Sequence, residues 1–190
     1  NDSMDDILNV IKKIVKHIKK KKTARLIYCG AGTSGRIAVQ DGVELTPTFG
    51  WPKTKIDFLL AGGKKALMES IEDAEDDTNS PKIIIEKKNI NSADVVFGLA
   101  ASGNTQFTNE ILKFSSSKKA LTIAISNNPN GFILNNAKYK IILNTKEEVI
   151  AGSTRLKAGT AQKVCLNIIS TLVMTQLGRV KKGMMINMIP

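Results

Sequence analysis

The sequence is poor in the residues that serve metal, redox and base-stacking chemistry. It has two cysteines, one histidine and one tryptophan in 190 residues, and aromatic side chains make up 5%. Cys29 and Cys165 lie far apart and form no CxxC pair, which argues against a disulfide framework and against a zinc site built on cysteine spacing. We therefore expect no metal and no cofactor, and we expect His17 at the surface or in an interface.

Long hydrophobic runs are also missing. The longest apolar stretch, residues 164–177, is interrupted by Asn167, Ser170 and other polar residues, and no charged-then-apolar signal peptide opens the chain. We predict a cytoplasmic protein without a membrane segment. The length suits one domain over residues 1–190, with residues 1–22 as a leading helix, since no linker or repeat is visible.

Negative charge is scarce: the sequence has 28 Lys and Arg residues but 17 Asp and Glu residues, which gives a formal net charge of +11. Such a surplus can indicate nucleic-acid binding. The densest basic run, Lys19–Lys22, is more typical of the last turn of a helix, where cations complement the dipole. Interleaved aromatic residues for base stacking are lacking as well. We expect no nucleic-acid partner, while a positive surface favours the approach of any anionic metabolite.

The sequence is rich in alternation between short apolar runs and helical stretches. An amphipathic helix is predicted at the N-terminus, where apolar residues recur at helical spacing from Met4 to Ile18 after a capping-box-like start at Ser3 and Asp6. Buried parallel strands are predicted over residues 25–29, 56–60, 95–100, 121–126 and 139–143. Crossover helices are predicted over residues 34–40, 64–76, 105–115 and 132–137, with a short Pro81-led helical turn and a long last helix from about Lys157 to near Gly178.

This alternation predicts an α/β fold. We expect a three-layer, doubly wound domain with a five-stranded parallel sheet and an N-terminal amphipathic helix. In such folds ligands bind beyond the carboxyl ends of the strands, so the loops that follow the strands are the places to search for a site.

Two of these loops are rich in glycine and hydroxyl residues. The first, residues 30–36, reads GAGTSGR and contains a GxGxxG pattern, but no acidic residue ends the second strand to bind a nucleotide ribose. The second, residues 100–105, reads AASGNT. Each places hydroxyls and free backbone N–H groups at a helix N-terminus, which can bind a phosphate group. A helix cap is the commoner role of such hydroxyls, but the pairing of two loops on adjacent strand ends favours a ligand.

A third polar segment, residues 147–163, opens the last helix, and either a ligand-lining role or a capped, solvated loop fits its composition. Together the strings GAGTSGR, VELTPTFG, AGG followed by EDAED, AASGNT, NNP and GSTRLKAGTAQK resemble the N-acetylmuramic acid 6-phosphate etherases, in that family's order and over nearly the whole chain. The resemblance implies a flavodoxin-like sugar isomerase (SIS) domain, also found in sugar-phosphate isomerases and in the glucokinase regulatory protein.

The resemblance further implies a carbon–oxygen lyase that needs no cofactor. It would remove D-lactate from ring-opened N-acetylmuramic acid 6-phosphate and leave N-acetylglucosamine 6-phosphate. The implied working carboxylates are Glu44 and Glu75. The implied phosphate-binding residues are Thr33, Ser34, Ser102, Asn104 and Thr105, and the implied pocket residues are Gly32, Ser153 and Lys157.

We assign Glu44 as the acid on the lactyl oxygen and Glu75 as the base, with the swapped or shared assignment left open. On a continuous helix Glu44 would lie ~15 Å from Ser34, too far to share one sugar. Either the chain turns at Gly42, or Glu44 serves the site of a second subunit. We expect a homodimer with sites near the interface.

The resemblance has departures. The family usually has a basic residue at the position of Asn104 and a proline at that of Gln106. Its C-terminal helical region is absent, so we expect this chain to be a fragment. Two alternatives to the etherase stay open: a non-catalytic sugar-phosphate sensor like the glucokinase regulatory protein, and a sugar-phosphate isomerase that uses a glutamate base.

Overall fold

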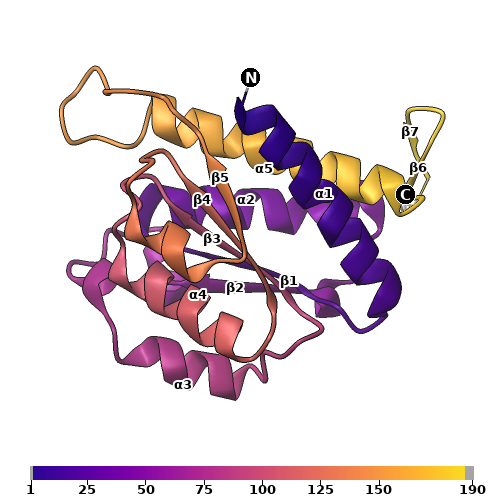
Figure 1. The fold of residues 1–190 in the computed structure, drawn as a ribbon, viewed down its shortest axis with the longest axis horizontal. Coiled ribbons are helices and arrows are strands. Elements are labelled where there is room, and N and C mark those ends of the chain that lie inside the picture. Colours follow the sequence, from indigo (N-terminus) through magenta and orange to yellow (C-terminus); the bar gives the residue numbers. More distant parts are fainter. Residues whose placement is uncertain (1, 187–190) are drawn as a thin grey trace.

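The computed structural model describes residues 2–186, and it has a parallel sheet between two groups of helices (Figure 1). The strands of the sheet are β1 (Leu26–Gly30), β2 (Ile56–Leu60), β3 (Val95–Ala100), β4 (Leu121–Ser126) and β5 (Tyr139–Ile142). They run parallel in the order β2-β1-β3-β4-β5. This is the flavodoxin-like order of a doubly wound fold, so the predicted fold class is confirmed.

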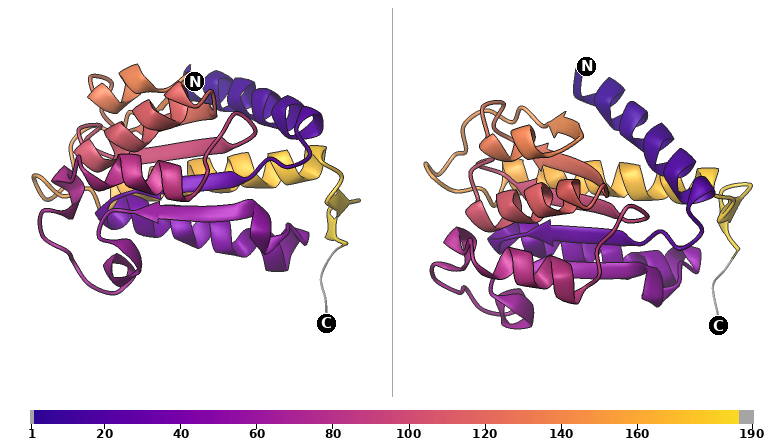
Figure 2. Two further views of the ribbon diagram at one scale, coloured as in Figure 1. Left: turned by 90° about the horizontal axis from the view of Figure 1, so that it is seen from below. Right: turned by 60° about the horizontal axis from the view of Figure 1, so that its bottom comes forward.

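The helices divide between the two faces of the sheet (Figures 1 and 2). One face carries α1 (Asp2–Lys20), α2 (Gly32–Phe49) and α5 (Lys157–Gln176), and the other carries α3 (Ser80–Lys87) and α4 (Gln106–Ser117). Each face buries its own apolar cluster, since Ile11, Tyr28 and Ile169 pack on the first face and Ile27, Ile85 and Ile111 on the second. Helices α1 and α5, from opposite ends of the chain, lie against each other.

Helix α2 is longer than predicted. It continues through Gly42 and ends at Phe49, where Gly50 adopts a left-handed φ of 61°. A Cβ on Gly42 would lie 2.5 Å from the ring of Phe58, so the missing side chain lets the helix approach β2 without breaking. The alternative in which the chain turns at Gly42 is therefore wrong, and so is the predicted end of this helix at residue 40.

The helix predicted over residues 64–76 is not formed. Two 3-10 turns stand in its place, η2 (Gly63–Leu67) and η3 (Ala74–Asp76). Left-handed backbone at Gly62, Gly63 and Asp73, with φ values of 78°, 68° and 57°, is incompatible with a continuous helix.

The remaining differences are small. Residues 132–136 form a 3-10 helix, η4 (Phe132–Asn136), and another, η1 (Lys53–Lys55), precedes β2. The Pro81-led helix is α3, as predicted, and α5 ends two residues before Gly178. A short hairpin of β6 (Val180–Lys181) and β7 (Met184–Met185) was not predicted, and residues 187–190 lie outside the described part.

The cysteines and the histidine have no role in the candidate chemistry and are held by the packing of the fold. Both cysteines are buried thiols. His17 is half-buried, and its Nε2 lies 2.9 Å from the carbonyl oxygen of Ala93, which precedes β3. Within residues 2–186, no helix is long and apolar enough to cross a bilayer.

Candidate functional site

The carboxyl ends of β1 and β3 lie next to each other, and each leads into the start of a helix. β1 ends at Gly30 just before α2, and β3 ends at Ala100 shortly before α4. Within residues 2–186, no side chain caps either helix start. Their first N–H groups therefore carry the positive end of each helix dipole without a side-chain acceptor. The structure thus brings together the two predicted phosphate-binding loops.

The first loop is shaped by close packing of two glycines. A Cβ on Gly35 would lie 2.8 Å from the carbonyl oxygen of Gly30, so only glycine allows α2 to begin this close to β1. Gly32 has a φ of 52°, and among the described residues no atom outside its own turn and its chain neighbours lies within 4 Å of where its Cβ would be. Ser34 is buried and Thr33 half-buried beside it. The loop therefore presents an open backbone surface flanked by two hydroxyls.

The second loop is tied to the segment that follows β4. The Ser102 hydroxyl accepts a hydrogen bond from the Asn104 N–H at 3.1 Å, and Asn104 Oδ1 accepts one from the Phe132 N–H at 3.2 Å. Asn128 Nδ2 donates to the Ser102 carbonyl oxygen at 2.9 Å. Thr105 is buried at the start of α4. Asn104, where the etherase pattern has a basic residue, thus serves here to hold the loop in place.

Glu75 shares a cavity with the first loop. The cavity has a volume of about 230 Å³, and Gly32, Arg36 and Glu75 are among its lining residues. Arg36 donates from Nε to the carbonyl oxygen of Ala66 at 2.9 Å and from Nη2 to that of Glu69 at 2.8 Å. Arg36 therefore holds the segment after β2 against α2. This residue ends the GAGTSGR string, but no role was predicted for it.

The acidic residues on either side of Glu75 differ in what they do: Asp77 binds the start of α3, whereas Glu72 lines the cavity. Asp77 accepts hydrogen bonds from the N–H groups of Asn79 and Ser80 at 2.8 and 3.0 Å, and also from the Ser80 hydroxyl. The Ser80 bonds lower the pKa of Asp77, which fixes the start of α3. Glu72 lines the same cavity as the exposed Glu75. The Glu75 turn is thus anchored on both sides, by Arg36 before it and by Asp77 after it.

Glu44 lies elsewhere in the chain. It is exposed on the fourth turn of α2, ~15 Å along the helix axis from Ser34 at 1.5 Å per residue. A separate groove of about 600 Å³, lined by Val43, Pro47, Phe58 and other residues, runs beside it. Within one chain the structure does not bring Glu44 to the cavity of Glu75.

The start of α5 is capped by a residue for which no individual role was predicted. Glu148 accepts hydrogen bonds from the N–H groups of Lys157 and Ala158, both at 3.0 Å, and these bonds, that of Ala158 first, lower its pKa. The Ser153 hydroxyl accepts a bond from the Arg155 N–H at 3.3 Å. These bonds cap the start of α5 and order the loop before it, and the ligand-lining role of residues 147–163 stays a prediction.

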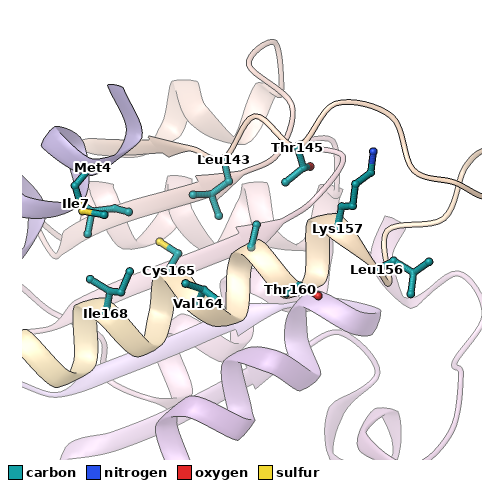
Figure 3. A pocket seen from close by; sticks show the side chains of 11 residues that line it. Met4, Ile7, Leu143, Thr145, Leu156, Lys157, Thr160, Val164, Cys165 and Ile168 are labelled. Atoms are coloured by element: carbon teal, nitrogen blue, oxygen red, sulfur yellow. The ribbon is translucent and has the colours of Figure 1, made fainter. Parts of the chain in front are cut away.

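The Lys157 side chain lines a different hollow from that of Glu75. A groove with a volume of about 710 Å³ lies between α1 and α5. It is lined mostly by apolar side chains such as Met4, Leu143 and Val164, with Lys157 at one end (Figure 3). Helix α5 nevertheless begins beside the first loop, because a Cβ on Gly159 would lie 3.3 Å from Cγ2 of Thr33. The backbone of α5, and not the Lys157 side chain, adjoins the candidate site.

A chain of amides links α5 to the sheet at the same end. The Asn127 N–H donates to the carbonyl oxygen of Ala101 at 3.2 Å, and Asn127 Nδ2 donates to that of Leu143 at 3.1 Å. Gln162 Nε2 donates to Asn127 Oδ1 at 3.0 Å.

Among residues 2–186, no cluster of three or more His, Cys, Asp or Glu side chains could hold a metal ion.

Known proteins resemble this chain in sequence. Residues 6–116 match the glucokinase regulatory protein N-terminal SIS domain, and residues 79–172 match the SIS domain. The chain is 43% identical over 184 residues to the N-acetylmuramic acid 6-phosphate etherase of Clostridium acetobutylicum, covering 96% of this chain and 61% of that one. It is 41% identical over 189 residues to the etherase of Bacteroides thetaiotaomicron, covering 98% and 68%. The chain belongs to the SIS-domain family that contains these etherases.

This SIS-domain chain spans 61%, 55% and 63% of the length of three of its etherase relatives. Solved structures resemble it in fold. A putative sugar-phosphate isomerase from Listeria monocytogenes superposes with a TM-score of 0.66 at 14% identity, covering 92% of this chain and 78% of that one. A putative phosphosugar isomerase involved in capsule formation from Bacteroides fragilis superposes with a TM-score of 0.66 at 18% identity, covering 95% and 88%.

Proposed function

We propose that this chain is the SIS-domain part of an N-acetylmuramic acid 6-phosphate etherase, a carbon–oxygen lyase that releases D-lactate and N-acetylglucosamine 6-phosphate. The observation that carries the proposal is the cavity shared by Glu75 and Gly32, beside two adjacent helix starts. Identities of 43% and 41% to proteins of that name support the choice of substrate.

The phosphate group of the substrate binds at the starts of α2 and α4. Each helix N-terminus stabilises an anion by ~0.3–2 kcal/mol through its dipole and free N–H groups. The hydroxyls of Thr33, Ser34, Ser102 and Thr105 add donors, so no lysine is needed at this position. Because Ser34 and Thr105 are buried, they hold fixed positions at the edges of the two loops.

Two carboxyl groups are needed for the chemistry. In the ring-opened sugar the C2 proton is acidified by the adjacent aldehyde, and C3 carries lactate as an ether. Glu75 removes the C2 proton while Glu44 protonates the departing lactyl oxygen, since an unprotonated alkoxide leaves poorly. Each such role contributes ~10²- to 10⁴-fold to the rate. Water then adds to the unsaturated aldehyde, with the proton transfers reversed.

A second subunit supplies Glu44. The distance along α2 keeps Glu44 from the phosphate site of its own chain, whereas its exposure leaves it accessible to a partner. Val43, beside it, is 47% exposed and lines the groove with Phe58, an apolar surface that a second copy would cover. A phosphorylated substrate and two free thiols fit a cytoplasmic location.

One experiment tests both the reaction and the sharing of sites. Lactate release from N-acetylmuramic acid 6-phosphate is measured for the wild-type protein, for Glu44→Gln, for Glu75→Gln, and for Glu86→Gln as a control on exposed α3. The first two variants are expected to lose activity, and the control to keep it. Mixing the two inactive variants in equal amounts then restores about a quarter of the wild-type rate if the sites are shared. Half of the dimers contain one subunit of each variant, and in each of these dimers one of the two sites regains both glutamates.

The outcomes separate the candidates. A mixture that stays inactive places both glutamates in one chain and refutes the shared site. Tight phosphosugar binding without lactate release favours a second candidate, a non-catalytic sugar-phosphate sensor, to which the match of residues 6–116 with the glucokinase regulatory protein N-terminal SIS domain also points. Interconversion of sugar phosphates without lactate release would instead identify an isomerase.

A further inference from the structure

The segment that carries Glu75 has a single polar tie to the rest of the protein. Residues 62–76 lie between β2 and α3 and contain η2 and η3. The Arg36 guanidinium donates to the carbonyl oxygens of Ala66 and Glu69 at 2.9 and 2.8 Å. Within the described chain, no other hydrogen bond and no ion pair joins residues 62–76 to another element. Apart from the packing of η3 against α4, Arg36 is therefore what anchors this segment.

The guanidinium suits this anchoring role because of its shape. Nε and Nη2 lie on one edge of a rigid plane, so the two bonds fix the orientation of the segment as well as its distance from α2. Their acceptors lie at and just after the end of η2, where carbonyl oxygens lack partners within the helix. Arg36 itself follows Gly35, whose close contact with Gly30 seats α2 on β1. The position of Glu75 thus depends on the helix that begins with the first loop.

The charge of Arg36 acts in the same direction. Four acidic side chains line the cavity, those of Glu69, Glu72, Asp73 and Glu75. Arg36 is the one cation among the lining residues that the structure describes. Like charges in so small a space repel one another, and a cation between them offsets the repulsion. Without Arg36 the segment would lose its polar tie and would gain a reason to open.

We propose that Arg36 is a positioning residue that fixes Glu75 relative to the phosphate-binding start of α2. A general base must lie within hydrogen-bond reach of the proton that it removes, and a displacement of about 1 Å can lower a rate about 100-fold. Arg36 acts through residues 62–76 and takes no part in proton transfer. This inference rests on the proposed function, because it takes Glu75 as the base.

The kinetic test is a double-variant cycle. Lactate release from N-acetylmuramic acid 6-phosphate is measured for wild type, Arg36→Gln, Glu75→Gln and the double variant. Arg36→Gln should lower kcat about 10- to 100-fold and change KM by less than about threefold, because the phosphate site is left in place. In the Glu75→Gln background it should change the residual rate by less than about twofold, since no base remains to be displaced. Losses that multiply in the double variant, or a higher KM with unchanged kcat, overturn the proposal.

Arg25 provides a matched control for loss of stability. It also donates to two backbone carbonyl oxygens, those of Lys88 and Asn89, but it precedes β1 at the opposite edge of the sheet from the cavity. Arg36→Lys and Arg25→Lys both keep the positive charge and remove the planar fork, and in Arg25→Lys the charge stays beside Asp94. Both should lower Tm, but only Arg36→Lys should lower kcat. An equal loss of kcat in the two variants attributes the effect to stability and refutes the positioning role.

A second measurement is independent of the reaction. Lys64 and Lys65 are exposed in η2, so trypsin can cut the segment whenever it opens. Arg36→Gln should be cut there about tenfold faster than wild type or more, while cleavage after the exposed Lys22 stays unchanged. Cleavage of the segment at the wild-type rate overturns the proposal. A wild-type protein that releases no lactate overturns the proposed function instead, and the cleavage rates then still decide whether Arg36 fixes the segment.

Discussion

Replacing Gly35 with alanine tests whether the contact between α2 and β1 sets the geometry of the first loop. The new Cβ would lie 2.8 Å from the oxygen and 2.9 Å from the carbon of the Gly30 carbonyl. Both are backbone atoms of the central part of the sheet, so they cannot move aside as a flexible side chain would. Because tolerated contacts begin near 3.4 Å, the start of α2 must shift by about 0.6 Å.

Two opposing effects decide the stability of Gly35→Ala. Overpacking of this kind costs about 1–3 kcal/mol. Alanine in a helix gains up to about 1 kcal/mol over glycine, and less in the first turns. We expect a net loss of about 1–2 kcal/mol, which in a protein of this size lowers Tm by about 2–8 °C. The displaced N–H groups should also weaken inorganic phosphate binding about three- to tenfold.

Thermal unfolding by circular dichroism and phosphate titration measure the two effects. Gly42→Ala is the matched control on the same helix, because its Cβ would meet the ring of Phe58 and lies far from the loop. Its Tm should fall as well, but its phosphate affinity should be unchanged. A Gly35→Ala protein as stable as wild type, or one that is less stable yet binds phosphate equally well, would refute the reasoning.

Two further predictions concern pH. Asp41 is buried and accepts hydrogen bonds from Tyr28 and from two side chains of α5. Burial raises its pKa, so the folded protein holds this proton more tightly than the unfolded chain does. The stability of the protein should therefore fall as pH rises above about 4. In Asp41→Asn, Tm measured from about pH 4 to about pH 7 should lose this slope, and parallel curves would contradict it. Glu148 has a pKa lowered by the Ala158 N–H, so the stability that it contributes is lost on acidification. Glu148→Gln should therefore lose less Tm than wild type between about pH 5 and about pH 3, and an equal loss would count against the cap.

The elements of the fold were predictable where burial imposes a hydrophobic period. The strands at residues 95–100 and 121–126 are fully buried, and a continuous apolar run in the sequence predicts such burial. The segment from residue 61 to residue 79 was not predictable in the same way. Its path depends on the Arg36 guanidinium meeting two backbone carbonyls and on the left-handed backbone of Asp73, neither of which leaves a periodic pattern.

The same division applies to the candidate site. The two glycine-rich loops were predicted because they directly follow strands and open helices, so local sequence contains most of their geometry. The Gln162–Asn127 pair joins residues 35 positions apart, and Asn127 in turn reaches β5. The packing of α5 on the sheet brings these two residues together. Nothing in the sequence next to either residue distinguishes it from the other Asn and Gln residues of the chain.

The contact between α1 and α5 has a consequence for the order of folding. The face that contains Ile27 and Ile85 is built from strands and helices that precede residue 121. The opposite face needs α1 and α5, the first and last long helices, and its contacts span most of the chain. On the ribosome, α1 can pack on β4 and β5 first, but part of its apolar stripe stays uncovered until residues 157–176 emerge, and during this interval the nascent chain is exposed to aggregation and to capture by chaperones.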